Sequence, residues 1–323
     1  MQNTDKKLKS CLTTGLAKGW SGFVWMLKIV VPISLFTSLL AWSGWISRLD
    51  FILEPSMGTI GLPPLAALPL ITGLLTGIYG AIAAMAPLPL TIDQMTLVAI
   101  FLLISHNLIQ EGVVQHKSGL PFVKSTLFRL IASILMVTVS SWMMGLYHEN
   151  GTAALANAPV LNHLSFFSAF KNWATVTLIL SGKMLVIIVV LMMILEIMKS
   201  YNLIDRIVRA IVPVLKILGL SRQTGFLWLT AALFGLTYGA AVIVEEVKEG
   251  DLSKEELERL QISIGINHAM IEDAALFLSM GISLFWLYIP RLAAAIIIVQ
   301  LLMIIKRLIF LPALSRVSLW FNR

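Results

Sequence analysis

The sequence predicts an all-α polytopic membrane protein, built of two homologous and inverted repeats with broken or re-entrant helices and short interfacial amphipathic helices. Two observations support this fold class. Hydrophobic residues make up 58% of the 323 residues and charged residues only 13%, against roughly 25% charged residues in a typical soluble domain. The second half of the chain also repeats a polar motif of the first half, at a matched position among the apolar segments.

Eight apolar stretches are long enough to cross a bilayer, which takes about 20 residues of helix. The first follows a lysine-rich tail and is longer than the core of a signal peptide, so we expect a retained membrane helix. The stretches are residues 20–43, 65–86, 94–115, 121–146, 173–199, 221–244, 258–280 and 283–313.

The repeat is clearest around two histidines. The run I-S-H-N-L-I-Q-E-G at 104–112 aligns with I-N-H-A-M-I-E-D-A at 266–274, and each residue lies 162 positions before its counterpart. Arg129 and Arg291 keep the same offset. Further upstream the offset is 158, and matched histidine, arginine, glycine and proline residues in one collinear order indicate a duplication.

The duplication divides the chain into five parts. We expect a cytoplasmic N-terminal tail, a first membrane repeat, a polar connecting loop, a second membrane repeat and a basic C-terminal tail. The corresponding ranges are 1–18, 19–146, 147–172, 173–313 and 314–323.

Each half has the same predicted order of elements: a spanning helix, a short amphipathic helix, a Gly/Pro-rich span, a helix with the histidine and a last span with the arginine near its start. In the second amphipathic segment Leu203, Ile207 and Ile211 share one face, while Arg206 and Arg209 lie off it. This pattern is typical of a helix that lies along the membrane surface.

Basic residues predict how the two halves are oriented. Segment 41–64 has one basic residue and the equivalent segment 199–222 has five, so equivalent loops should face opposite sides of the membrane. Both basic tails are then expected in the cytoplasm of a bacterial-type inner membrane, with 147–172 outside. This requires an odd number of crossings per half, so one span of each half should be broken or re-entrant. The best candidates are 62–81 and 219–239.

The predicted site lies on the two histidine helices. Ser253 followed by Glu256 predicts a capped helix start, and His268 would lie roughly 22 Å further along a continuous helix. Glu272 would share its face, while Asp273 would point about 100° away. The predicted residues of a binding site or proton relay are His106, Gln110, Glu111, Asn267, His268, Glu272 and Asp273, with Arg129 and Arg291 as charge partners and Gly77, Gly80, Gly235 and Gly239 as gating glycines.

Ionisable groups at membrane depth usually mark a pathway, a relay or a binding site. Two purely structural roles are alternatives to this interpretation. The histidine and carboxylate groups could form a purely structural clamp that satisfies the backbone of a broken helix, and the arginines could extend to the membrane surface.

Several functions are disfavoured by the sequence. It contains no nucleophile elbow, HExxH motif or Walker loop, so we expect no enzyme, no catalytic residue and no cofactor. Cys11 is the lone cysteine, which excludes a disulfide within the chain. Histidine with carboxylates suits divalent ions, but two ligands from each half are a weak signal, and no metal site is predicted. The net charge of +7 lies mainly at the ends of apolar runs, so nucleic acid is not an expected partner.

Two segments together resemble the nucleoside-recognition or Gate domain family. They are T-Y-G-A-A at 237–241 and I-N-H-A-M-I-E-D-A-A-L-F at 266–277. The resemblance is best over 220–300 and weaker over 60–140. That family includes gate regions of concentrative nucleoside transporters, the membrane domain of the ferrous-iron transporter and spore maturation membrane proteins. The resemblance implies a transport-type fold of two gate repeats, although this chain has no GTPase domain, no cysteine in a span, and less than the length of a nucleoside transporter.

The function predicted from these observations is a permease that moves a small polar solute or cation, with possible coupling to protons. One alternative is an envelope or spore-maturation-like scaffold without transport, and another is a divalent-cation channel or transporter. The expected partners are the lipid bilayer and a small polar solute or cation, with a homo-oligomer or a membrane-protein partner as further possibilities.

Overall fold

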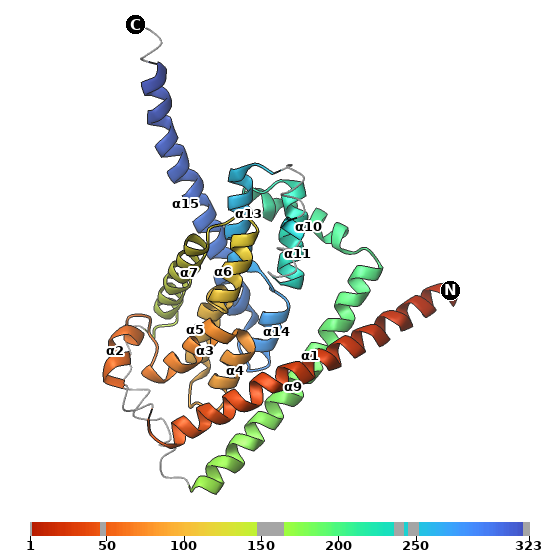
Figure 1. The fold of residues 1–323 in the computed structure, drawn as a ribbon, viewed down its shortest axis with the longest axis vertical. Coiled ribbons are helices and arrows are strands. Elements are labelled where there is room, and N and C mark those ends of the chain that lie inside the picture. Colours follow the sequence, from red (N-terminus) through yellow and green to blue (C-terminus); the bar gives the residue numbers. More distant parts are fainter. Residues whose placement is uncertain (1, 46–49, 147–164, 236–241, 245–251, 319–323) are drawn as a thin grey trace.

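A computed structural model describes residues 2–45, 50–146, 165–235, 242–244 and 252–318 of the chain. Within these ranges the elements are helices (Figure 1), and five are long and apolar enough to cross a membrane. The predicted all-α polytopic membrane fold is therefore confirmed. The five spans cover Lys6–Trp42, Ile92–Lys117, Phe122–Met143, Phe166–Ser200 and Leu284–Leu308.

The first half of the fold runs from α1 to α7. Its elements are α1 (Gln2–Trp42), α2 (Asp50–Gly58), a 3-10 turn η2 (Pro64–Ala66), α3 (Ala67–Thr76), α4 (Ile78–Met85), α5 (Ile92–Ser105), α6 (Leu108–Lys117) and α7 (Phe122–Met143). The second half runs from α9 to α15. Its elements are α9 (Phe166–Ser200), α10 (Ile204–Ile217), α11 (Arg222–Phe234), α13 (Lys254–Asn267), α14 (Glu272–Leu278) and α15 (Leu284–Ser318).

Helices α1 and α9 lie side by side in opposite directions (Figure 1). Gly15 and Gly19 permit this contact, because a methyl group on Gly15 would lie 2.5 Å from the Met193 Cα atom. Small residues four positions apart allow close backbone approach between membrane helices. Met26 on α1 and Met184 on α9, which are equivalent in the repeat, are both fully buried. The first helices of the two halves therefore pack on each other.

Helices α3 and α4 form a tight hairpin. They pack against each other, and a methyl group on Gly73 of α3 would lie 2.9 Å from the Cβ atom of Ala81 on α4. Eight residues span about 12 Å of a continuous helix, so this approach requires the chain to fold back. The reversal occurs at Gly77, whose φ of 89° is accessible mainly to glycine. The Gly/Pro-rich span of the first half is thus broken into a helical hairpin and is not one continuous helix.

The histidine helices are each broken in two. Helix α5 continues into α6, and α7 packs along both of them. In the second half α13 continues into α14, and α15 packs along both of those. Helices α5 and α6 together form one of the five candidate spans, whereas the α13–α14 pair is not among them. An odd number of crossings per half therefore stays a prediction.

The predicted starts of the histidine helices are capped. The Thr91 hydroxyl oxygen accepts a hydrogen bond from the Gln94 amide, and the Gln94 side-chain oxygen accepts one from the Thr91 amide, which completes a capping box. Ser253 accepts from the Glu256 amide at 3.2 Å. The Glu256 carboxylate is directed to another helix, where it accepts hydrogen bonds from the Ser221 amide and the Thr224 hydroxyl at the start of α11. Glu256 thus joins the starts of two helices.

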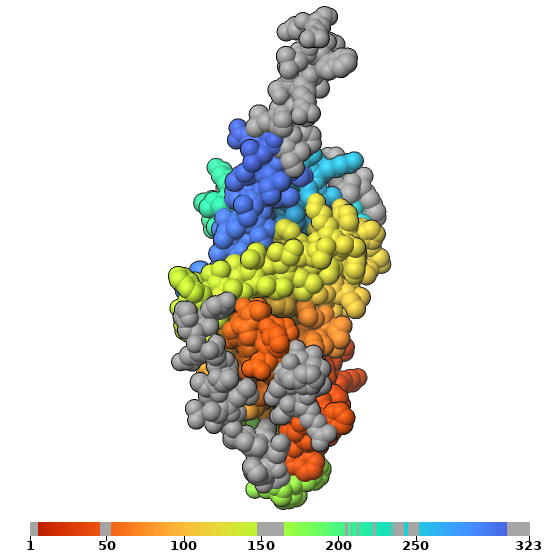
Figure 2. All heavy atoms as spheres, turned by 90° about the vertical axis from the view of Figure 1, so that its left-hand side faces the viewer, coloured from red at the N-terminus to blue at the C-terminus, as the bar shows by residue number. Residues whose placement is uncertain are grey.

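Surface helices and apolar clusters complete the fold. One face of α10 packs against buried apolar residues through Leu203, Ile207 and Ile211, as the amphipathic pattern predicts. One apolar cluster gathers around α1, α3, α4 and α5, and a second around α10, α11, α13 and α15. Figure 2 shows α7 crossing one face of the molecule, between α2 on one side and α15 on the other. Of the predicted connecting loop 147–172, residues 147–164 lie outside the described residues, and residues 166–172 belong to α9.

Candidate functional site

The site is built around two helix breaks, each located at a histidine. His106 ends α5 with an extended backbone, and Asn107 then adopts a φ of 49°. His268 ends α13 in the same way, and Ala269 has a φ of 47°. The prediction of one continuous helix through His268 is therefore wrong. The sequence carries no proline or glycine at either break, so helical periodicity gave no signal of them.

Backbone hydrogen bonds to carbonyl groups of α3 and α11 stabilise the two breaks. The Asn107 amide donates to the Gly73 carbonyl at 2.9 Å. The Ala269 amide donates to the Ala231 carbonyl at 3.1 Å, and the Met270 amide to the Ala232 carbonyl at 2.7 Å. A left-handed conformation at a non-glycine residue costs roughly 1–2 kcal/mol, and these bonds offset part of that cost.

Two buried arginines satisfy the carbonyl groups that the breaks leave free. Arg129 donates from Nε to the Ile104 carbonyl at 2.8 Å and from Nη2 to the His106 carbonyl at 2.7 Å. Arg291 makes the equivalent bonds to the Ile266 and His268 carbonyls at 3.0 and 2.7 Å. Both side chains are at most 1% exposed. They therefore do not extend to the membrane surface, and each one stabilises the break in its own half.

The breaks bring the two histidines together. His106 Nε2 lies 3.4 Å from His268 Nε2, although the residues are 162 positions apart. Glu111 Oε1 lies 3.1 Å from His106 Nε2 and 3.0 Å from His268 Nε2. All three residues are buried, with exposures of 6% or less. One carboxylate of the first half thus contacts a histidine of each half.

The carboxylates of the two halves have different partners. Glu111 also forms an ion pair with Arg129, whose Nη2 lies 2.5 Å from Oε2. Asp273, the counterpart of Glu111, has no ion pair with Arg291 in the described part of the chain. Its Oδ2 atom lies 3.7 Å from His106 Nε2 and has no hydrogen-bond partner although the residue is 6% exposed. The predicted pairing of arginine and carboxylate is therefore present in the first half only.

The other predicted residues lie around this centre. Gln110 is exposed and accepts a hydrogen bond from Asn107 at 2.9 Å. Glu272 does not pair with His268, because the break places it at the start of α14, where its carboxylate accepts from the Tyr79 hydroxyl at 2.7 Å. Asn267 is fully buried, and neither polar atom of its side chain has a hydrogen-bond partner.

The gating glycines are placed as follows. Gly77 and Gly235 end α3 and α11 with φ values of 89° and 84°. Each faces the break of its own half, since a methyl group on Gly77 would lie 3.8 Å from Asn107 Cβ, and one on Gly235 would lie 3.9 Å from Ala269 Cβ. Gly80 lies in the α4 helix. Gly239 lies outside the described residues.

Sequence reasoning missed four residues of the site: Gly73, Tyr79, Asn107 and Ala269. Tyr79 belongs to a Tyr-Gly-Ala triplet that recurs at 238–240, and that recurrence could have drawn attention to it. Asn107 follows a histidine, and asparagine is among the non-glycine residues that tolerate the left-handed region best. Ala269 carries no such signal.

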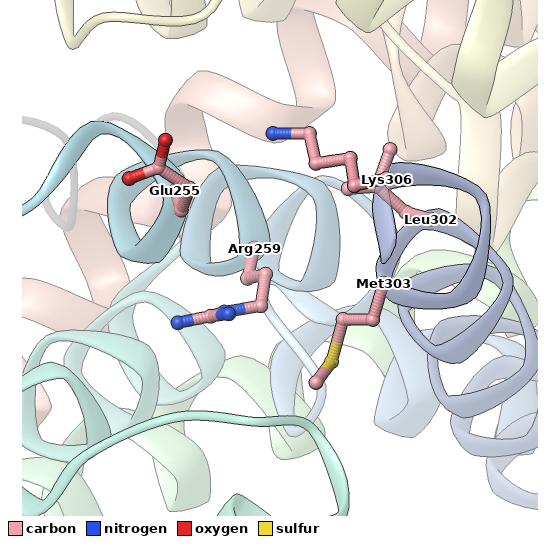
Figure 3. A pocket seen from close by; sticks show the side chains of 5 residues that line it. All are labelled: Glu255, Arg259, Leu302, Met303 and Lys306. Atoms are coloured by element: carbon pink, nitrogen blue, oxygen red, sulfur yellow. The ribbon is translucent and has the colours of Figure 1, made fainter. Parts of the chain in front are cut away.

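A pocket of about 170 Å³ lies elsewhere, between α13 and α15 (Figure 3). Glu255 and Arg259 line it from α13, and Leu302, Met303 and Lys306 from α15. None of these residues contacts the histidine centre. We therefore place the candidate site at the two breaks and not in this pocket.

A similar protein of known sequence supports the assignment of this chain as a membrane protein. A Bacillus subtilis (strain 168) protein named "Uncharacterized membrane protein YvoD" is 26% identical over 295 residues, which cover 90% of this chain and 93% of that protein. The chain is a membrane protein. No family model matches it, so the resemblance to the Gate family stays a prediction, and no solved structure matches it.

Proposed function

We propose that this membrane protein is a permease that moves a small polar solute or a cation through the centre formed by the two helix breaks. The observation that carries this proposal is the meeting of both breaks at buried ionisable groups, with His106, Glu111, His268 and Asp273 contributed by both halves. Broken helices at membrane depth are tolerated where they are buried in protein or line a water-filled cavity. Binding sites of many secondary transporters are built from such helices.

Polar residues near the breaks support an aqueous route to the centre. Thr76 precedes the hairpin tip and Gln110 follows the break in the first half, and both side chains are exposed. A polar group that faced hydrocarbon would lose its hydrogen bonds to water, at a cost of several kcal/mol. Exposure of these residues is less costly if water reaches them. The half-buried pair of Tyr79 and Glu272 extends the same polar region.

The main alternative is a scaffold, in which the same groups only stabilise the breaks. Arg129 and Arg291 do stabilise them, since their hydrogen bonds go to backbone carbonyls. A scaffold does not account for Asp273, however, whose Oδ2 atom is buried without a hydrogen-bond partner. Burial of a carboxylate oxygen that accepts no hydrogen bond is costly, and a bound ligand would offset this cost.

Water accessibility separates the two functions. Cys11 is the lone cysteine, so a Cys11→Ser background allows single cysteines to be placed at Gln110 or Thr76. We expect a charged, membrane-impermeant thiol reagent to label Gln110→Cys and Thr76→Cys in membrane vesicles. The control is Ile131→Cys on α7, because Ile131 is 55% exposed and lies two residues from Arg129, at the depth of the centre. It should react only after denaturation.

Protection of both test cysteines to the level of Ile131→Cys would contradict the permease proposal and favour the scaffold. Labelling after denaturation in detergent shows that each cysteine is present and reactive. Vesicles that expose opposite faces of the membrane should label the two test positions to different extents if the centre opens to one side at a time.

A further inference from the structure

We propose that the centre binds a divalent transition-metal ion of the zinc class, through His106 Nε2, His268 Nε2, Glu111 Oε1 and Asp273. The binding part of this inference stands on geometry alone. The further step, that this ion is the transported cation, rests on the proposed function. The sequence suggested only two ligands in each half, whereas the structure brings ligands of both halves together.

The hydrogen bonds of the two histidines fix which ring nitrogens are free. His106 Nδ1 lies 2.8 Å from the Leu102 carbonyl oxygen, and His268 Nδ1 lies 3.0 Å from the Ile264 carbonyl oxygen. A carbonyl oxygen only accepts, so Nδ1 must carry the proton in both rings. In the neutral imidazole Nε2 then presents a lone pair, which is the form of histidine that binds metals.

The two Nε2 atoms and one Glu111 oxygen lie close together. The two Nε2 atoms are 3.4 Å apart, and Glu111 Oε1 lies 3.1 and 3.0 Å from them. All three atoms are acceptors, so their approach is repulsive unless a positive species lies among them. Asp273 Oδ2 adds a fourth acceptor, 3.7 Å from His106 Nε2 and without a donor of its own.

A proton satisfies this arrangement only in part. One proton on His106 Nε2 would pair that ring with Glu111, but it would leave the His268 lone pair and Asp273 Oδ2 without a donor. A proton on each ring would place two cations 3.4 Å apart beside the buried Arg129. A divalent ion can accept all four lone pairs at once.

The distances match those between ligands of one metal ion. Zn²⁺ binds histidine nitrogen at about 2.0–2.1 Å and carboxylate oxygen at about 2.0–2.2 Å, usually with tetrahedral geometry. Ligand atoms around such an ion are about 3.3–3.4 Å apart, from the same bond lengths. The observed separations of 3.4, 3.1 and 3.0 Å are close to this value. The ligand atoms of His106, His268 and Asp273 all lie within 4.8 Å of one another.

The proposed ligand side chains are also held by the kinds of neighbouring groups that surround metal ligands in proteins. Ligating histidines usually donate their other ring N–H to a carbonyl or carboxylate, and ligating carboxylates are hydrogen-bonded in turn. Here each Nδ1 contacts a backbone carbonyl, and Arg129 contacts Glu111 Oε2, which leaves Oε1 directed at the histidines. Imidazole with carboxylate favours zinc, iron, nickel or manganese over calcium and magnesium, which prefer oxygen ligands only.

The arginines limit how tightly the ion is held. Arg129 and Arg291 bring two positive charges close to the centre, and these oppose a second pair of positive charges on the metal. The affinity should therefore be lower than in a structural zinc site. A transported ion must bind well enough to enter and weakly enough to leave.

Calorimetric titration tests the binding. The full chain would be purified in detergent without a histidine tag, treated with a chelator and titrated with Zn²⁺. We expect one saturable site per chain, at least 10-fold weaker in Asp273→Asn, which removes a carboxylate whose Oδ2 atom has no hydrogen-bond partner. His106→Ala and His268→Ala should abolish the site. His116→Ala is the control, since His116 is exposed and should leave the affinity unchanged.

Absence of saturable binding, or equal affinity of the parent, Asp273→Asn and His106→Ala chains, would overturn the metal site. Should the histidine variants fail to fold, the result for Asp273→Asn decides. Uptake of Zn²⁺ into vesicles that contain a zinc-sensitive dye then separates the two proposals. Binding without uptake would keep the metal site and contradict transport, while water access at Gln110 without binding would contradict the metal site and leave the permease proposal in place.

Discussion

Arg129 and Arg291 have the same backbone contacts and differ in a single ion pair. Both donate to two carbonyls on either side of a helix break. Among the described residues only Arg129 also contacts a carboxylate, at 2.5 Å from Glu111. The chain thus offers a matched pair of buried arginines in which the effect of a carboxylate partner can be measured.

We expect Arg129→Gln to destabilise the protein more than Arg291→Gln does, by roughly 3 kcal/mol. Both substitutions remove hydrogen bonds to the backbone, but Arg129→Gln also leaves Glu111 buried without its charge partner. Thermal unfolding of the detergent-purified variants would give the difference. The double variant Arg129→Gln with Glu111→Gln should recover part of the loss, because it removes the uncompensated charge. Equal losses in the two single variants would mean that the ion pair contributes nothing to stability.

The sequence predicts which residues form the site but not which contacts they make. The matched histidines, carboxylates and arginines were found by their equal spacing in the two halves. Their contacts were not, because Ala269 adopts a φ of 47° that no local sequence preference favours. The conformation depends on carbonyl groups of α11, far away in sequence, and local patterns do not contain such information. The predicted contact between His268 and Glu272 is absent for this reason.

At the scale of elements, the hairpin of α3 and α4 depends on the reversal at Gly77. The packed surfaces on either side are apolar and short, with helices of 10 and 8 residues. Proline and glycine in this segment predicted a broken or re-entrant element correctly, since both residues disfavour a continuous helix. The counterpart after α11, residues 236–241, lies outside the described residues.

We expect Gly77→Ala to destabilise the protein by about 1–2 kcal/mol, because an L-residue is strained at a φ of 89°. The nearest atoms to the new methyl group would be 3.8 Å away, so the effect reports backbone strain and not a clash. The matched control is Gly182→Ala, within helix α9 with nothing nearby. It should stabilise by roughly 0.5–1 kcal/mol. Melting temperatures that shift in the same direction for both variants would contradict the assigned reversal.

At the scale of the whole molecule, composition and repetition predicted the fold class, while packing decided how the halves meet. The apolar stretches located all five long spans. They could not tell that α1 and α9 cross closely at Gly15 and Gly19, because small residues have this role only when a partner helix is known. They also could not separate a crossing span from a hairpin by length alone.

An odd number of crossings in each half would place both ends of the chain on one side of the membrane. We expect a tag at the N-terminus and a tag at the C-terminus to be accessible from the cytoplasmic face, and a cysteine introduced at Asn157 in the connecting segment to react from the other face. Labelling of right-side-out and inverted vesicles with an impermeant reagent would measure this. Ends on opposite sides would show that one half crosses an even number of times, which would contradict the inverted arrangement.

The Gly73 carbonyl accepts two hydrogen bonds, from the Gly77 amide at the hairpin tip and from the Asn107 amide at the break. The Ala231 carbonyl accepts the equivalent bonds from Gly235 and Ala269. Each shared acceptor makes the tip and the break a single conformational unit, since neither can shift far without loosening the other. A ligand that stabilises one geometry of a break therefore also favours one geometry at the end of α3 or α11, and a change at that helix end acts back on the ligand.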